Sequence, residues 1–449
     1  MHTVAPDADV HTQLEARILT LPVEITTEIF LWCLTNALIP SRNKLRKTPL
    51  DKPPILLTRI CRDWREIALS TPHLWNHVCL EFGGARGLRG YIDAWWVSFL
   101  DIWILRAQGQ PLSMTISNLT SDTDPNAALV PLLDRHRPRW RDVTLKLPFD
   151  LFYHFEGHEC LPMLRRLSLE THGISRDLDI PSPITAFERA PALDHLCLGG
   201  GLRPSHFLLP WTQLVGLELA TAGAQDCLDC LRSAPNLVSC SFEIRESSST
   251  AALLSVPPLL RLKTLTLSGP APSIIFPYTV MPVLAELDLT GSLNAGDLSG
   301  VRFFVAHSEC QLRRLRIHYI SSVLTEPAIQ LLGTLTSLER LDLSATEAKT
   351  IISLLHRLHD EASFLPQLQE LAITHHKVRD ENMHTMFRSI ADALARREVS
   401  SAEHVRLCSF ALFMQDEETA PRMRLRQMWQ GLSQRGMRVS VRNRYERWI

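Results

Sequence analysis

Hydrophobic residues recur along most of this chain in a six-residue pattern, Leu-x-x-Leu-x-Leu, with mostly polar residues between them. Successive copies begin 21 to 30 residues apart. One such unit cannot bury its own apolar edge, so the pattern predicts units that stack and share a core. The copies begin at Leu164, Leu193, Leu214, Leu262, Leu284, Leu312, Leu338 and Leu368, with a weaker one at Leu237.

The last two apolar residues of each copy alternate as in a strand, so they point inward while their neighbours line the other face. The spacing is in the range of leucine-rich repeats. We therefore predict an α/β fold, a solenoid with a curved parallel sheet, helices outside and an atypical C-terminal cap. Further strands are expected over residues 112–116, 143–147, 405–407 and 439–441, and helices over 227–231, 328–332, 351–358, 383–397 and 423–432.

The first hundred residues have a helical pattern instead. A first helix has an apolar stripe formed by Ile25, Ile29, Phe30, Cys33 and Leu34. The elements expected after it are a helix over residues 55–69, a strand over 75–80, and a helix over 92–104 whose three tryptophans we interpret as core residues.

Two stretches are basic and interrupt these patterns. Residues 35–54 contain four prolines and five basic residues, which predicts an exposed loop. We favour a solvated insertion there, and a phosphate-binding or nuclear-localisation segment is the alternative. The arginine-rich C-terminus, from Arg422 to Arg447, is interpreted as a water-facing end cap rather than a membrane or nucleic-acid contact.

The overall charge and the cysteines restrict the class of protein. A net charge of −1 lacks the basic footprint of a nucleic-acid-binding protein. The ten cysteines form no framework of close pairs, which is typical of a reducing compartment, cytoplasmic or nuclear. The polar N-terminal segment lacks the apolar run of a signal peptide, and the most apolar stretch, residues 91–105, is too short and too charged to span a bilayer.

No motif in the chain predicts catalysis. Cys227 and Cys230 have redox spacing, but no second pair follows at zinc spacing, so we interpret them as structural. His375 and His376 have no nearby acid at metal-ligand spacing and are expected at the surface. The chain has no phosphate-binding loop and no nucleophile elbow. We expect no enzyme activity, no metal and no cofactor.

Residues 21–80 resemble an F-box of the kind common in large fungal families. The resemblance is carried by three phrases: residues 21–30 (LPVEITTEIF), 59–68 (RICRDWREIA) and 71–75 (TPHLW). It divides the chain into an N-terminal tail (1–20), an F-box-like helical domain (21–80) and a leucine-rich-repeat solenoid (81–449). The loop over residues 35–54 is longer than in a minimal F-box.

The resemblance implies a substrate-recognition subunit of a cullin-based ubiquitin ligase. The F-box would bind a Skp-type adaptor, and through it a cullin, while the repeats bind an unidentified client protein. The alternative is a repeat scaffold that never recruits a ligase. An apolar patch with a polar rim suits such an adaptor. The residues expected to supply it are Leu21, Pro22, Ile25, Ile29, Leu57, Ile60 and Cys61. Trp64 is expected to pack between helices.

Strand alternation also predicts a client-binding surface on the repeats. Its centre is acidic and the next strand is basic, a step that would orient a client of opposite polarity. The residues expected to form it are Glu218, Glu243, Glu286, Asp288, Arg314 and Arg316.

Overall fold

The computed structural model describes residues 21–37, 52–82, 94–118, 126–155, 159–171, 182–245, 253–270, 272–291, 293–320, 325–345, 348–376, 382–398, 404–414 and 423–443. Contacts divide the chain into two compact units. The first consists of Met1–Leu193 with Ser205–Pro210, and the second of Asp194–Pro204 with Trp211–Ile449.

The first unit combines helices with a parallel sheet whose strands follow chain order. Its helices are α2 (Val23–Ala37), α3 (Arg62–Ser70), α4 (Ala94–Arg106) and α5 (Asn126–Arg135). Its strands are β1 (His77–Phe82), β2 (Leu112–Asn118), β3 (Trp140–Lys146) and β4 (Arg166–Glu170). Short 3₁₀ helices in this unit are η2 (Leu57–Arg59), η3 (Pro72–Leu74), η4 (Arg137–Arg139) and η5 (Phe149–His154).

The second unit repeats a strand and a connecting segment, and its strands also pair in parallel and in chain order. The strands are β5 (His195–Gly199), β6 (Gly216–Ala222), β7 (Ser239–Ile244), β8 (Thr264–Ser268), β9 (Glu286–Thr290), β10 (Arg314–Ile320), β11 (Arg340–Ala345), β12 (Glu370–His375), β13 (Ser409–Met414) and β14 (Arg438–Asn443). The connecting helices are α6 (Ala224–Ser233), α7 (Ala295–Ser308), α8 (Thr325–Gly333), α9 (Ala348–Asp360), α10 (Met383–Arg397) and α11 (Met423–Gln434), and the 3₁₀ helices are η7 (Trp211–Gln213) and η8 (Pro272–Tyr278).

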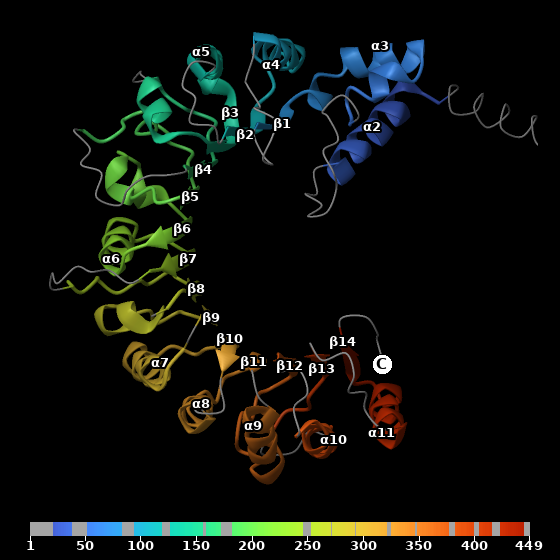
Figure 1. The fold of residues 1–449 in the computed structure, drawn as a ribbon, viewed down its shortest axis with the longest axis vertical. Coiled ribbons are helices and arrows are strands. Elements are labelled where there is room, and N and C mark those ends of the chain that lie inside the picture. Colours follow the sequence, from blue (N-terminus) through green and yellow to red (C-terminus); the bar gives the residue numbers. More distant parts are fainter. Residues whose placement is uncertain are drawn as a thin grey trace, which may run out of the picture. The chain divides into compact units, whose positions relative to one another are not determined.

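The leucine pattern forms the core, as predicted. Leu287, Leu315 and Leu341 occupy the same register position on β9, β10 and β11, and all three are buried. The helices α7 to α11 lie on the side of the strands to which these leucines point, and no described helix covers the other side in the second unit (Figure 1). We call the outward positions of β5 to β14 the open face. The α/β class and the parallel sheet are therefore confirmed.

Several predicted elements are also confirmed. The helix predicted over residues 383–397 is α10, and those predicted over 227–231, 328–332, 351–358 and 423–432 lie within α6, α8, α9 and α11. The predicted closing strand is β14. Trp103 of α4 is buried, with its ring centroid 5.1 Å from that of Trp75. Trp64 packs edge-on against Phe30 of α2 at 4.9 Å, so it joins two helices as expected.

The single helix predicted over residues 55–69 is wrong. The chain forms the short turn η2, leaves helical geometry at Cys61 (φ −149°, ψ 175°) and begins α3 at Arg62. The Cys61 sulfur accepts a hydrogen bond from the Trp64 backbone N–H at 3.4 Å, which is the role of an N-cap. Apolar periodicity alone could not reveal this interruption.

The strand predicted over residues 405–407 is also wrong. The N–H groups of Val405 and Leu407 donate to the carbonyls of Pro366 and Arg397 instead of a neighbouring strand. The strand instead begins at Ser409. Its outward residue Phe413 is apolar like the inward residues on either side of it, so the sequence there does not show a simple alternation of apolar and polar residues. The strand predicted over 75–80 begins two residues late, because Trp75 ends the η3 turn and its indole N–H donates to the Ala68 carbonyl at 2.8 Å.

The two basic stretches lie partly outside the described residues. Of the loop predicted over 35–54, residues 35–37 end α2, residues 52–54 precede η2, and the segment between them is not among the described residues. Arg438 and Arg442 at the C-terminus lie on β14. Arg422, Arg444 and Arg447 are outside the described residues, as are the side chains of Trp95 and Trp96.

Candidate interaction surfaces

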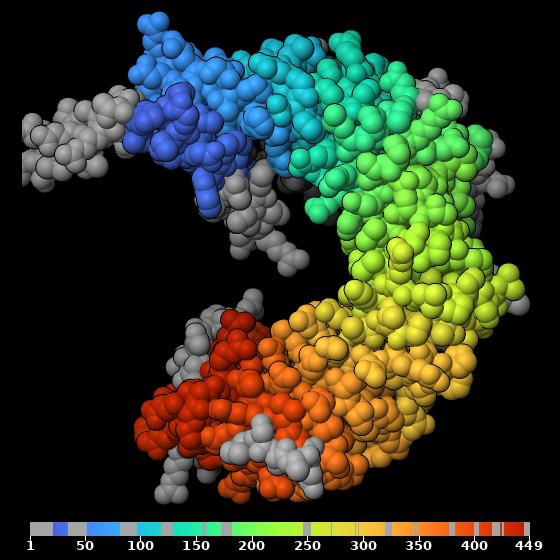
Figure 2. Space-filling model, turned by 180° about the vertical axis from the view of Figure 1, so that it is seen from behind, coloured from blue at the N-terminus to red at the C-terminus, as the bar shows by residue number. Residues whose placement is uncertain are grey.

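Helix α2 has a buried side and an exposed apolar stripe. Thr26 and Phe30 are buried toward the other helices of the first unit. Ile25, Ile29 and Trp32, at positions i, i+4 and i+7, form a neighbouring stripe that is exposed, and the Trp32 side chain is 70% exposed. Figure 2 shows α2, in dark blue, at the surface of the first unit. A surface helix normally turns polar residues to water, so this exposed stripe is available for a partner.

The turn that precedes α3 adds further exposed apolar side chains. Leu56 and Ile60 are exposed on either side of η2, and Cys61 is half-buried as the N-cap of α3. Leu57 does not belong to this surface, contrary to prediction, since it is only 4% exposed.

The exposed apolar residues include some that sequence reasoning missed. Leu21 and Pro22, which it included, are exposed just before α2. Val23, Trp32 and Leu56 are exposed and were not predicted. The signal for Trp32 was present, because it lies three residues after Ile29 on the same helical face. Leu56 carried no such signal, because it lies next to Leu57 in the same apolar pattern and only Leu57 is buried.

The outward face of the first unit carries a polar row across its four strands. His77, Ser113, Asp142 and Arg166 occupy the same register position on β1 to β4. The Ser113 hydroxyl donates to Asp142 at 3.1 Å. Burial lowers the pKa of His77, and the negative charge of Asp142 opposes that shift only in part. The Ser113 hydroxyl donates to a carboxylate, whereas in a serine–histidine–aspartate triad it would donate to the imidazole, so the contacts of this row do not follow the order of a triad.

The open face over β5 to β8 consists mainly of small and hydroxyl-bearing residues. They are Gly216, Ser239, Ser241, Thr264, Thr266 and Ser268. A Cβ on Gly216 would lie 2.4 Å from Cδ2 of His195, so the imidazole of β5 lies across that glycine. Glu218 is exposed on β6, and Glu243 on β7 pairs with Arg245 at 3.1 Å. The two predicted acidic residues are thus separated from those of β9 by the uncharged strand β8.

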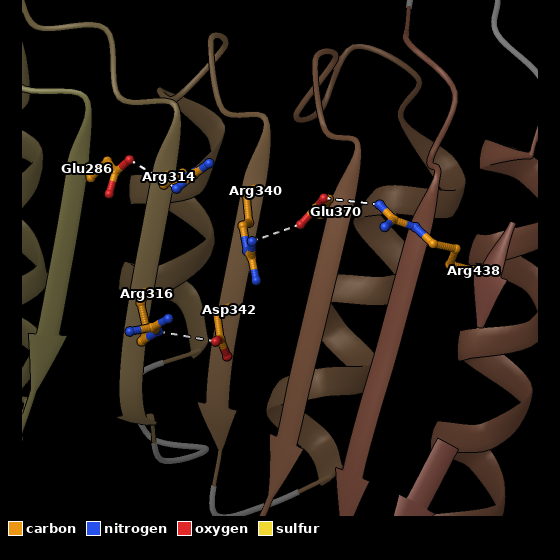
Figure 3. A network of polar contacts seen from close by, with 7 residues as sticks. All are labelled: Glu286, Arg314, Arg316, Arg340, Asp342, Glu370 and Arg438. Atoms are coloured by element: carbon orange, nitrogen blue, oxygen red, sulfur yellow. Dashed lines mark hydrogen bonds and ion pairs between the residues drawn. The ribbon is translucent and has the colours of Figure 1, made fainter. Parts of the chain in front are cut away.

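The open face over β9 to β14 is a ladder of ion pairs (Figure 3). On β9 and β10, Glu286 pairs with Arg314 at 3.1 Å and Asp288 with Arg316 at 2.8 Å. The remaining ladder pairs are Arg316–Asp342 at 3.2 Å, Arg340–Glu370 at 3.1 Å and Arg438–Glu370 at 3.4 Å. We call these eight residues the charged ladder.

The predicted step from an acidic to a basic strand does not present separate negative and positive surfaces to a client. Parallel pairing places β9 directly beside β10, so the acids and the arginines bind each other. The charged ladder has four arginines and four carboxylates, which sum to zero. Long-range attraction of an oppositely charged client is therefore weak, and recognition depends on individual positions within the ladder.

The residues set aside as non-catalytic have mixed outcomes. Burial raises the pKa values of the Cys227 and Cys230 thiols well above their ordinary range, so both remain protonated inside α6, as a structural role requires. The surface position predicted for His375 is wrong, because it is fully buried. It continues the inward alternation of Leu371 and Ile373 on β12. His376 next to it is half-buried and contacts the Ser344 hydroxyl.

The described part of the chain contains no cluster of three or more His, Cys, Asp or Glu side chains placed to hold a metal ion. A small apolar pocket in the second unit is lined by Leu358, Leu368, Leu371, Ala393, Leu394, Arg397 and Leu407. Among the helices in the described ranges, none combines the length and apolar character needed to cross a membrane. The geometry offers two surfaces for macromolecular contact: the exposed stripe of α2 and the open face.

Comparison with known proteins adds no assignment to this geometry: no family model matches the chain, and no curated protein matches it.

Proposed function

We propose that the chain is a substrate-recognition subunit of an SCF-type cullin ubiquitin ligase, with an N-terminal F-box and leucine-rich repeats. In this proposal α2, η2 and α3 bind a Skp-type adaptor, and the open face of the repeats binds a client protein. The sequence phrases at residues 21–30, 59–68 and 71–75 support the first half. The parallel repeat architecture with one uncovered face supports the second.

The observation that carries the proposal is the exposed stripe of α2. A solvent-facing helix gains nothing from turning isoleucine and tryptophan to water, whereas the core of a protein interface is apolar and rich in aromatic residues. Trp32 is the most exposed member, and tryptophan is enriched among the residues that contribute most to binding. Ile25 and Ile29 lie on the same face and extend the contact along the helix.

The proposed function requires no catalytic residue in this chain. A receptor that holds a client near a ubiquitin-charged enzyme raises the effective concentration of the client lysine at the thioester. The chain contributes one contact to the adaptor and one contact to the client. Placement in the cytoplasm or nucleus, where such ligases act, belongs to the same proposal.

The test is adaptor binding by matched charge insertions in the first unit. Ile25 of α2 and Ile102 of α4 are each 49% exposed, so glutamate at either position has a similar cost in the folded chain. We expect Ile25→Glu to weaken capture of a purified Skp-type adaptor by roughly tenfold or more, since interface anchors typically contribute over ~1.4 kcal/mol. Ile102→Glu should bind like the wild type. Binding is measured by titration calorimetry on the full chain.

Circular dichroism and thermal unfolding would show whether both variants remain folded. If Ile25→Glu is folded and still binds the adaptor, α2 is not the contact. If the wild-type chain itself does not bind, the scaffold alternative replaces the ligase assignment. Trp32→Ala provides a second variant, with the same expected direction and no introduced charge.

A further inference from the structure

Where residues of the charged ladder lie opposite each other on neighbouring strands, their charges are opposite in every pairing but one. In its first row, the register order from β9 is Glu286, Arg314, Arg340 and Glu370. In its second row, Arg316 stands between Asp288 and Asp342. The exception is the direct pairing of Arg314 with Arg340 on β10 and β11. Two like charges face each other there, in the middle of a surface that elsewhere pairs opposite charges.

The geometry of this exception leaves hydrogen-bond donors available between the two strands. Neighbouring strands lie about 4.8 Å apart, so in-register side chains are direct neighbours. Arg314 and Arg340 each make an ion pair through one Nη1 atom, and in both cases the carboxylate lies on the outer neighbour, Glu286 or Glu370. Figure 3 shows these contacts directed away from the β10–β11 seam. A guanidinium group has five N–H donors, so most of them are not used by these pairs.

Such a pairing has a cost in the unoccupied protein. Like charges directly opposite on neighbouring strands destabilise a sheet. The two side chains are 58% and 45% exposed, so water reduces the cost without removing it. A position that breaks an otherwise consistent local pattern is where a functional site is expected.

We propose that Arg314 and Arg340 bind an oxyanion group of the client, either a phosphoryl group or a carboxylate. The planar guanidinium fork matches the oxygen geometry of both groups, and two forks from adjacent strands can hold one anion between them. The first row including Arg438 carries a net charge of +1, so an anion there is favoured even with Glu286 and Glu370 nearby. That the anion belongs to a client rests on the proposed function, whereas the anion site itself does not.

Arg316 provides the matched control. Its side chain is 46% exposed, close to Arg340 at 45%, and it lies on the same face. It forms ion pairs with Asp288 on one side and Asp342 on the other. Arg316→Gln therefore changes the net charge as much as Arg314→Gln or Arg340→Gln does, but removes an arginine already held by carboxylates.

The experiment measures binding of inorganic phosphate and of acetate to the full chain, by calorimetry and by the shift in thermal midpoint, with chloride added to hold ionic strength constant. We expect phosphate to bind the wild type and Arg316→Gln, and to bind Arg314→Gln and Arg340→Gln roughly tenfold more weakly or worse, given the strength of charge-assisted hydrogen bonds. Preference for phosphate over acetate identifies a phosphoryl ligand, and preference for acetate over phosphate identifies a carboxylate.

A second readout needs no ligand. Arg340→Gln should lower the thermal midpoint in chloride buffer less than Arg316→Gln does, because it removes a like-charge neighbour together with one ion pair, whereas Arg316→Gln removes two ion pairs. The proposal is overturned if neither anion binds the wild type, or if Arg316→Gln loses binding as much as the other two variants. Should a glutamine variant fail to fold, Arg340→Lys keeps the charge, loses the planar fork and should still weaken binding. No adaptor is present, so this outcome is independent of the test of the proposed function.

Discussion

At the scale of single residues, two glycines allow neighbouring strands to end in close contact. Gly269 follows β8 with φ +118°, and Gly291 follows β9 with φ +144°. A Cβ on Gly269 would lie 1.9 Å from the Ile244 carbonyl oxygen, and one on Gly291 would lie 2.0 Å from the Gly269 oxygen. Both the backbone conformation and the space therefore require glycine.

Alanine at Gly291 should destabilise the chain by about 2–4 kcal/mol, because left-handed strain adds to a backbone clash. Gly300 is the control. It lies inside α7, where a Cβ would lie 3.6 Å from that of Ser273 in ordinary contact. Gly300→Ala should stabilise by about 0.5–1 kcal/mol through helix propensity. Urea unfolding of both variants measures the difference, and a similar effect in both would rule out the backbone explanation.

At the scale of elements, the end of one helix is held by the end of the next. Arg397, the last residue of α10, is 3% exposed. Its guanidinium donates to the carbonyls of Leu358 at 3.2 Å and Glu361 at 3.1 Å, at the C-terminus of α9, and also to the carbonyl of Phe364. The last carbonyls of a helix have no hydrogen-bond donor within the helix. Arg397 supplies donors to them at a buried position that water does not reach.

Arg397→Met should therefore cost about 2–4 kcal/mol in unfolding free energy, since it leaves several buried carbonyls without a donor while keeping most of the apolar volume. The neighbouring Arg396 is exposed. Arg396→Met should change stability by less than about 0.5 kcal/mol. Chemical unfolding distinguishes the two, and equal losses would show that charge, not carbonyl capping, is responsible.

At the scale of the whole molecule, each strand pairs with the strands next to it in chain order, so a repeat contacts mainly the repeats that adjoin it. Stability in such an array is close to a sum over units and their nearest-neighbour interfaces. A destabilising substitution in one repeat should then affect only the repeats next to it.

Hydrogen exchange followed by mass spectrometry tests this expectation. Gly291→Ala should accelerate amide exchange in peptides that cover β8, β9 and β10 of the second unit. Peptides covering β2 and β3 of the first unit should exchange at the wild-type rate. Uniform acceleration across both units would mean that the chain unfolds as a single cooperative block.

The amino-acid pattern by itself determined which residues point inward and which outward. Leucine at fixed offsets predicts the buried face of each strand, since alternation along a strand is a local property. The same local reasoning places Ile25 and Ile29 on one side of α2. It could not show that Trp32 is the most exposed residue of that stripe.

Only the tertiary structure decided how those faces are used. Glu286 and Arg314 are 28 residues apart, and they form an ion pair because parallel register places β9 beside β10. The same register places Arg314 opposite Arg340. Leu57 is buried although the adjacent Leu56 is exposed, and His375 is buried because β12 continues through it. Periodicity reports on neighbours in the sequence, whereas register and burial depend on packing between residues far apart in it.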